Sequence, residues 1–237
     1  MHCNIAVLEG AEEDHSRYDH SGLLYPVNTL RNLAACDNMA HPAPTVFLVD
    51  SDFIPSSNLR SELHLSEVQE RLAAGAARSV AVVVPALELS EDSKELPLKE
   101  SQVVIGMWYQ GGVQGFHTDY FPMGYEPTDF DRWMMTEEDD HDGALAYSVP
   151  YKSYFEPYVV MSKSSVPFYD ERFRGYGMNK ASLVSLACFP CIQSEGVMGL
   201  SSADMHSEGG QPRTQPAYFV VLRRGFVFAR PHPKSKD

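Results

Sequence analysis

The sequence lacks the long apolar run that a membrane-spanning helix requires. Such a helix takes about 20 consecutive apolar residues, whereas the best candidate here, residues 79–89 (SVAVVVPALEL), is interrupted by Pro85 and carries Glu88 near its end. The first residues also lack the basic start and the long apolar stretch of a signal peptide. We therefore interpret 79–89 as a buried strand and its exit, and we expect no membrane segment in this chain.

Basic residues are scarce. The chain of 237 residues carries 19 Lys and Arg against 32 Asp and Glu, which gives a formal net charge of −13. Non-specific binding to nucleic acid needs clustered cations, so the composition excludes this class of function for the chain as a whole. An acidic protein can still bind an anionic nucleotide, but it then needs a bridging metal cation or a few local Arg and Lys residues.

Cysteine is scarce as well, with four residues in the whole chain: Cys3, Cys36, Cys188 and Cys191. The last two form a CxxC pair, which is at most half of a zinc site, and no second CxxC or His pair stands at a matching spacing. The thiols are either unpaired and buried or joined in disulfides. Their positions determine neither the pairing nor the redox compartment.

Apolar periodicity indicates an α/β protein. The chain is 43% hydrophobic and 22% charged, and its length fits one large α/β domain or at most two small ones. Helices and strands alternate in the first half, at 25–35 (helix), 45–49 (strand), 62–77 (helix) and 79–84 (strand). Strands that are apolar on both faces belong in a sheet covered by helices, so this order predicts a largely parallel open sheet.

The rest of the chain is less regular. We expect further strands at 4–8, 158–161, 218–222 and 226–228. Residues 193–216 are rich in Ser, Gly, Glu and Gln, which is typical of a mobile insertion.

The sharpest chemical signal is the run VFLVDSDFIP at residues 46–55. Asp50 and Asp52 stand where an apolar strand breaks into a turn, so both carboxylates can converge on one cation. Hard divalent ions such as Mn²⁺ and Mg²⁺ prefer carboxylate and phosphate oxygens and can bridge a protein to a diphosphate. Ligands of open α/β sheets also bind at the carboxyl ends of strands. A capped turn after a strand remains the alternative interpretation of the same residues.

Seven short motifs follow one another along the chain. They are YPVNTLRNLA (25–34), VFLVDSDFIP (46–55), VVVPALE (82–88), GYEPTDFDRW (124–133), FEPYVV (155–160), YDERFRGYGMNK (169–180) and PHPKSKD (231–237). Together, and in this order, they resemble glycosyltransferase family 49, which includes the LARGE-type glucuronyltransferase domain. The resemblance covers the chain from residue 25 to its end, apart from the stretch 193–216.

The resemblance implies a GT-A fold, a UDP-sugar donor with glucuronic acid as the expected sugar, Mn²⁺ or Mg²⁺, and inversion at the anomeric carbon. It also implies a glycan or glycoprotein acceptor and a location in the Golgi lumen. We expect a single domain over 1–237, with a partial nucleotide- and metal-binding half at 1–92 and an acceptor-binding half at 93–237. The part before the metal-binding strand is shorter than in the family, so we expect an incomplete sheet at the N-terminus.

The same resemblance suggests roles for individual residues. His232, in the terminal PHP, matches the family's C-terminal histidine and is the expected third metal ligand beside Asp50 and Asp52; a solvated tail is the alternative. A general base must take the proton of the acceptor hydroxyl. Glu156, just before a strand, is our candidate, with Asp170 and Asp129 as runners-up.

Other polar residues are expected to contact the donor: Asn28, Arg31, Ser51 and Lys180. The fork of Arg donors suits phosphate oxygens, and Lys180 suits the carboxylate of a uronic acid, although a structural ion pair explains it equally well. Tyr125 and Trp133 are suited to stacking on acceptor sugars, but they fit a core equally well.

Two functions other than catalysis of glycosyl transfer remain consistent with the sequence. One is a non-catalytic relative that binds a carbohydrate or nucleotide and keeps the Asp50–Asp52 pair. The other is a phosphotransfer or hydrolase fold that uses paired aspartates.

Overall fold

The computed structural model describes residues 26–36, 44–74, 80–90, 101–136, 143–172, 178–194 and 219–229. The helices are α1 (Val27–Cys36), α2 (Leu59–Leu63), α3 (Ser66–Ala74), α4 (Ser101–Tyr109), α5 (Pro122–Tyr125), α6 (Phe130–Thr136) and α7 (Asn179–Ser194), with 3-10 helices at Glu126–Thr128 and Lys163–Ser165. The strands are β1 (Thr45–Leu48), β2 (Phe53–Pro55), β3 (Ala81–Val84), β4 (Ala86–Leu89), β5 (Val113–Gly115), β6 (Leu145–Val149), β7 (Tyr158–Ser162), β8 (Phe219–Leu222) and β9 (Val227–Ala229).

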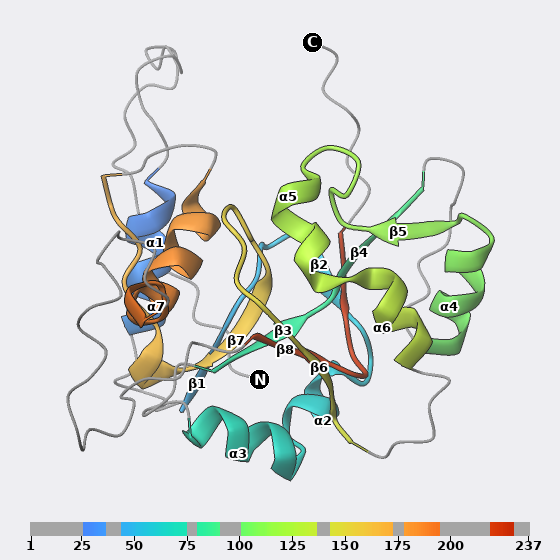
Figure 1. Ribbon diagram of the computed structural model, residues 1–237, viewed down its shortest axis with the longest axis horizontal. Helices are drawn as coiled ribbons and strands as arrows, with labels where there is room; N and C mark the ends of the chain where they lie inside the picture. The colour runs from blue at the N-terminus through green and yellow to red at the C-terminus, as the bar shows by residue number, and fades with distance from the viewer. Residues whose placement is uncertain are drawn as a thin grey trace, which may run out of the picture.

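The described strands form two mixed sheets (Figure 1). The larger sheet has the order β1-β7-β3-β8-β6, and the smaller has the order β2-β9-β4-β5. Only the pairs β3–β8 and β4–β9 are parallel, and the other five pairs are antiparallel. The α/β class is confirmed, but the prediction of a largely parallel sheet is wrong. All four residues of β3 are buried, as predicted; burial on both faces reports a central position in a covered sheet and says nothing about the direction of the neighbours.

The chain crosses from the larger sheet to the smaller one at three places. Residues 49–52 join β1 to β2, Pro85 alone separates β3 from β4, and residues 223–226 join β8 to β9. The second and third crossings touch, because the amide of Val227 donates to the carbonyl of Pro85 at 3.0 Å. Each sheet therefore contains strands from both predicted halves of the chain, and the division at residue 92 does not separate the two sheets.

Most of the helices and strands expected from the sequence are present. The expected helix at 62–77 is instead two helices, α2 and α3, which are separated by a turn at His64 and Leu65. The expected strand at 4–8 lies outside the described residues, as does the stretch 195–216 of the expected insertion, while its first two residues complete α7. No helix in the described parts of the chain is long and apolar enough to cross a membrane.

The helices lie around the sheets in two groups. Figure 1 shows α1 beside α7 at one side of the molecule and α4 with α6 at the other, while α3 contacts β3 and β7.

The side chains of Trp133 and Tyr125 are buried, at 1% and 2% exposed. Trp133 lies on α6, and its indole N–H donates to the carbonyl of Leu222 at 2.9 Å. Both rings are part of the core, so the suggestion that they stack on acceptor sugars is wrong for this structure.

Replacing Gly225 or Gly106 by alanine tests the described backbone, because the two positions differ in the space available for a Cβ. Gly225, between β8 and β9, has φ +93°, and an added Cβ would lie 3.1 Å from Cα of Leu59. Gly106, inside α4, has no atom within 4 Å of such a Cβ. We expect Gly225→Ala to lower the free energy of unfolding by about 1–3 kcal/mol, and Gly106→Ala to raise it by about 0.4–1 kcal/mol. Urea unfolding of both variants measures the two changes, and equal changes would contradict the described turn.

Candidate active site

The first candidate residue, Asp50, lies at the end of β1, where the chain leaves the larger sheet. The amide of Phe53 donates to the carbonyl of Asp50 at 3.2 Å and closes a turn that contains Ser51 and Asp52. Phe53 then begins β2, which pairs with β9 of the smaller sheet. The turn is thus fixed at both ends by strands of different sheets. The predicted strand-end position of this pair of aspartates is confirmed.

Three elements converge on the Asp50 carboxylate. Arg31 of α1 donates to Oδ1 at 3.0 Å, while Tyr158 of β7 and Lys180 of α7 donate to Oδ2 at 2.7 Å and 3.1 Å. Lys180 also donates to the hydroxyl of Tyr158 at 2.8 Å and to that of Tyr125 at 3.4 Å. We call these five residues the Asp50 cluster.

Electrostatics keep Asp50 ionised although the carboxylate is partly buried. Burial on its own raises the pKa of Asp50, but Lys180, the Tyr158 hydroxyl and Arg31 outweigh it and hold the pKa below its usual value. Burial lowers the pKa of Lys180, and Asp50 opposes that effect. The pKa of Tyr158 is raised, first by burial and then by the Asp50 charge. Tyr158 is therefore a neutral hydrogen-bond donor.

The candidate base, Glu156, lies close to this cluster. Its backbone amide donates to the carbonyl of Gly124 at 2.9 Å, and its carboxylate accepts a hydrogen bond from the amide of Ala181. Burial is the largest effect on its pKa and raises it, while Lys180 opposes the shift. A carboxylate with a raised pKa next to a cationic group is a feature of many acid–base sites.

The structure adds His117, which the sequence did not single out. Its backbone lies in the left-handed region at φ 55°, and its ring stacks on Phe116 with centroids 3.7 Å apart. Burial lowers the pKa of His117, and the charges of Asp50 and Asp52 act on it in the opposite direction. A single histidine in a loop gives no signal in a sequence, because only the tertiary fold brings it near the aspartates.

Asp52 shares neighbours with Asp50. The charges of both aspartates act on the pKa of His117 and on that of Tyr158. Asp52 is half-buried, whereas Ser51 between them is exposed. The two aspartates therefore border one region.

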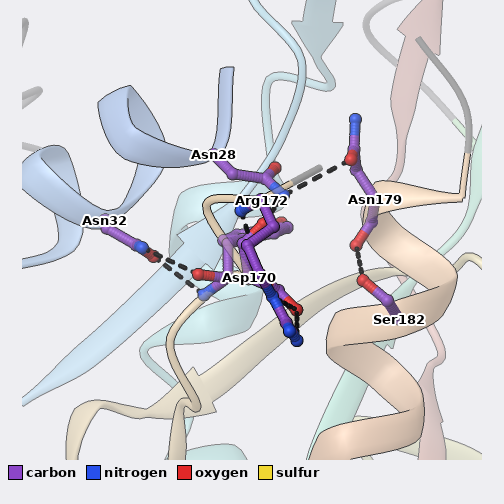
Figure 2. A network of polar contacts seen from close by, with 7 residues as sticks. Asn28, Asn32, Asp170, Arg172, Asn179 and Ser182 are labelled. Atoms are coloured by element: carbon purple, nitrogen blue, oxygen red, sulfur yellow. Dashed lines mark hydrogen bonds and ion pairs between the residues drawn. The ribbon is translucent and has the colours of Figure 1, made fainter. Parts of the chain in front are cut away.

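Helix α1 holds the segment that precedes α7 (Figure 2). The side-chain amide of Asn32 donates to the carbonyl of Tyr169 at 2.9 Å, and its oxygen accepts from the amide of Tyr169 at 2.8 Å. Asn28 is fully buried, and its Nδ2 donates to the carbonyl of Asp170 at 2.8 Å and to Oδ1 of Asn179 at 3.3 Å. In this arrangement Asn28 joins α1 to the first residue of α7, so it positions Lys180.

The remaining predicted residues are not part of the Asp50 cluster. The Asp170 carboxylate pairs with Arg172 at 2.6 Å, and this pairing lowers the pKa of Asp170 to about 2. His232 lies outside the described residues. Asp129 has a left-handed backbone at φ 56° and accepts from the amide of Arg132 at 3.2 Å, at the beginning of α6.

Asp50 and Asp52 fit a hard divalent cation by the chemistry of their oxygens, although they do not complete a metal site. No group of three or more His, Cys, Asp and Glu side chains within the described ranges could hold a metal ion. Oδ2 of Asp50 already accepts two hydrogen bonds, while Oδ1 accepts one and keeps a lone pair. A cation held here would need further oxygens, which a bound diphosphate can supply.

A cavity of about 620 Å³ extends from the cluster along β1. Arg31, Asp50 and Lys180 line it together with β1 and with apolar residues of α7 such as Leu183. Its volume lies within the usual range of small-molecule sites, about 300–1,000 Å³. The cluster therefore faces a space large enough for a ligand.

Comparison with known proteins identifies the family of the chain. The family model Glyco_transf_49, described as "Glycosyl-transferase for dystroglycan", matches residues 2–189. The chain belongs to this glycosyltransferase family. The match confirms the family predicted from the motifs, and it contains every described residue of the Asp50 cluster.

Relatives of this family 49 chain include xylosyl- and glucuronyltransferase LARGE1 from Homo sapiens, which is 34% identical over 217 residues, or 91% of this chain and 23% of LARGE1. Human xylosyl- and glucuronyltransferase LARGE2 is 35% identical over 161 residues, or 68% of this chain and 20% of LARGE2. Glycosyltransferase-like protein gnt14 from Dictyostelium discoideum is 30% identical over 175 residues, which are 72% of this chain and 25% of gnt14. The family 49 chain thus spans only 20–25% of the length of these relatives.

The raised pKa of Glu156 predicts a pH-dependent effect on stability. An unfolded Glu titrates near about 4.3, and the folded pKa is higher. The folded state therefore loses stability as the pH rises from the unfolded pKa through the folded one. Glu156→Gln keeps the oxygen that accepts from Ala181 and cannot ionise, so we expect it to raise the free energy of unfolding at pH 7.

The gain from Glu156→Gln should disappear at about pH 3, well below the unfolded pKa, where both the folded and the unfolded Glu are protonated. Unfolding in urea at the two pH values measures the difference. Glu126→Gln is the control, because Glu126 is exposed at 68% and pairs only loosely with Lys152 at 3.7 Å. An equal effect of Glu156→Gln at both pH values would contradict the burial of this charge.

Proposed function

We propose that the chain is the catalytic part of a metal-dependent, inverting glycosyltransferase. It transfers a sugar, with glucuronic acid as the expected one, from a UDP-sugar to a hydroxyl group of a glycan or glycoprotein. The observation that supports this best is the convergence of Arg31, Lys180 and Tyr158 on an ionised Asp50 at the head of a ligand-sized cavity. Family membership supports the reaction class.

In this proposal Asp50 and Asp52 hold Mn²⁺ or Mg²⁺, with His232 as a third ligand. The ion would act as a Lewis acid toward the diphosphate, on which negative charge develops as the sugar leaves. Arg31 lies within the same cluster, and its second terminal nitrogen, Nη1, is buried with no hydrogen-bond partner among the described residues. That nitrogen is available to a phosphate oxygen.

Glu156 is the proposed general base. It removes the proton from the acceptor hydroxyl while that oxygen forms a bond to the anomeric carbon and the bond to UDP breaks, so one displacement inverts the centre. A raised pKa makes Glu156 a stronger base than an ordinary carboxylate. Asp170 is a weaker candidate, because its pairing with Arg172 lowers its pKa to about 2.

The relatives support the choice of donors to test and the proposed location. The names of LARGE1 and LARGE2 specify xylosyl and glucuronyl transfer, so UDP-glucuronic acid and UDP-xylose are the donors to test. Since these relatives are named as glycosyltransferases, we infer a glycosylation compartment, the Golgi lumen, for this chain.

Removing the negative charges of the aspartates tests the proposal directly. We expect Asp50→Asn with Asp52→Asn to reduce Mn²⁺-dependent transfer or hydrolysis of the two UDP-sugars by about 10²–10³-fold or more, because the diphosphate loses its electrostatic support. Asp131→Asn, at an exposed position of α6, is the matched control. A chain that binds UDP with Mn²⁺ but never turns over would instead be a non-catalytic binding protein.

A second substitution tests the role of Glu156 as general base independently of donor binding. Glu156→Gln should lower kcat by about 10²–10⁴-fold and leave UDP affinity unchanged, since the base contacts only the acceptor. Asp170→Asn is the comparison, and its kcat should stay within a few-fold of the unmodified chain. Steady-state kinetics and calorimetry with UDP measure the two effects, and a larger loss in Asp170→Asn would transfer the role to that residue.

A further inference from the structure

One oxygen of the Asp50 carboxylate, the proposed metal ligand, already has its hydrogen-bond acceptor positions filled. Oδ2 of Asp50 accepts two hydrogen bonds, from Tyr158 and from Lys180, and so has no acceptor position left. An incoming cation can reach Oδ2 only if one of these donors leaves. Tyr158 is neutral and belongs to the buried strand β7, whereas Lys180 is a cation on a flexible stem.

Lys180 is held in a site shaped for an ammonium group. Its Nζ lies 3.1 Å from Oδ2 of Asp50 and 2.8 Å from the Tyr158 hydroxyl. It also lies 4.1 Å from the centroid of the Tyr158 ring, and its side chain is only 16% exposed. An ammonium group buried to this extent needs an anionic partner. In this structure that partner is Asp50.

A divalent cation at Asp50 would lie beside two cations that already pair with this carboxylate. Arg31 lies 3.0 Å from Oδ1 and Lys180 lies 3.1 Å from Oδ2. Both repel a divalent cation that binds the same carboxylate, because like charges repel strongly at short range. A nucleotide diphosphate brings a negative charge on each phosphate and offsets this repulsion.

We propose that Lys180 competes with the divalent cation for Asp50, and that a nucleotide diphosphate relieves this competition by accepting the Lys180 ammonium. This inference rests on the proposed function and concerns the order of binding at the same site. The metal binds weakly to the empty chain and tightly once the nucleotide is present. By reciprocity, the nucleotide binds more tightly in the presence of the metal.

The local structure allows this exchange without movement of the backbone. Asn179, the residue before Lys180, is tied to Asn28 of α1, as Figure 2 shows. The first turn of α7 is therefore anchored, and only the side chain of Lys180 has to turn from Asp50 to a phosphate oxygen. Its long stem carries a compact charge with rotatable donors, which suits such a change of partner.

The test measures Mn²⁺ binding itself, by the electron paramagnetic resonance signal of free Mn²⁺, with and without UDP. We expect the unmodified chain to bind Mn²⁺ at least about tenfold more tightly with UDP than without it. Without UDP, Lys180→Met should bind Mn²⁺ at least about tenfold more tightly than the unmodified chain, a difference of about 1.4 kcal/mol. Signals from UDP alone correct for Mn²⁺ bound by the free nucleotide.

Matched variants show whether the gain comes from this site. Lys152→Met removes an exposed lysine that pairs loosely with Glu126, and it should not change Mn²⁺ affinity by more than about twofold. The gain of Lys180→Met should vanish when Asp50→Asn is added, because the two changes act on one contact. Tyr158→Phe removes the other donor to Oδ2 and should raise Mn²⁺ affinity without UDP in the same direction, so it serves if Lys180→Met does not fold.

Two negative results have different meanings. If the unmodified chain binds Mn²⁺ with UDP, but neither Lys180→Met nor Tyr158→Phe binds it more tightly without UDP, the competition is refuted and the proposed function stands. If the unmodified chain does not bind Mn²⁺ even with UDP, the metal-dependent function is refuted and this inference is refuted with it.

Discussion

The Asp50 carboxylate is the constraint on which the arrangement of the site depends. A partly buried negative charge must be compensated, and here the compensation comes from α1, β7 and α7 at once. The residues involved are separated by 19, 108 and 130 positions in the sequence. Because each donor is itself ordered by the carboxylate, the relative positions of α1, α7 and the larger sheet are coupled through one side chain.

The cations that pair with Asp50 also provide local positive charge in an acidic protein. A chain with a net charge of −13 needs local cations if it is to bind an anionic nucleotide. Arg31 and Lys180 supply these cations in the lining of the cavity. Their side chains are mostly buried, so solvent screens their charges only weakly. The asparagines of α1 support this placement, since Asn28 and Asn32 hold the segment that leads into α7.

Local patterns in the sequence predicted local features well. The helix at α1, the buried strand β3 and the position of Asp50 at a strand end each follow from a single run of about a dozen residues or fewer, and the family follows from seven such runs in order. Strand direction was predicted wrongly, because a strand such as β3 has an antiparallel partner, β7, and a parallel partner, β8, that lie far away in the chain. Apolar periodicity carries no information about such partners.

Individual site residues were harder to predict for a related reason. Arg31 and Lys180 were identified because they lie within the motifs and their cationic donors suit the anionic groups of a nucleotide sugar, and both lie at Asp50. His117 and the hydroxyl of Tyr158 were missed, since their importance arises only from contacts across the fold. Asn28 shows the converse problem: a polar residue on a helix can bind a ligand or tie two segments together, and only the buried contact distinguishes these roles.

The late position of β8 and β9 in the chain has a consequence for the order in which the two sheets form. Within 219–229, β8 is an inner strand of the larger sheet and β9 is an inner strand of the smaller sheet. β9 also pairs with β2, the strand that follows the turn at Asp50. A ribosome releases β8 and β9 after all the other described segments. Until β8 and β9 have been made, β3 and β4 each lack one of their two neighbours and expose a strand edge that can pair with another chain.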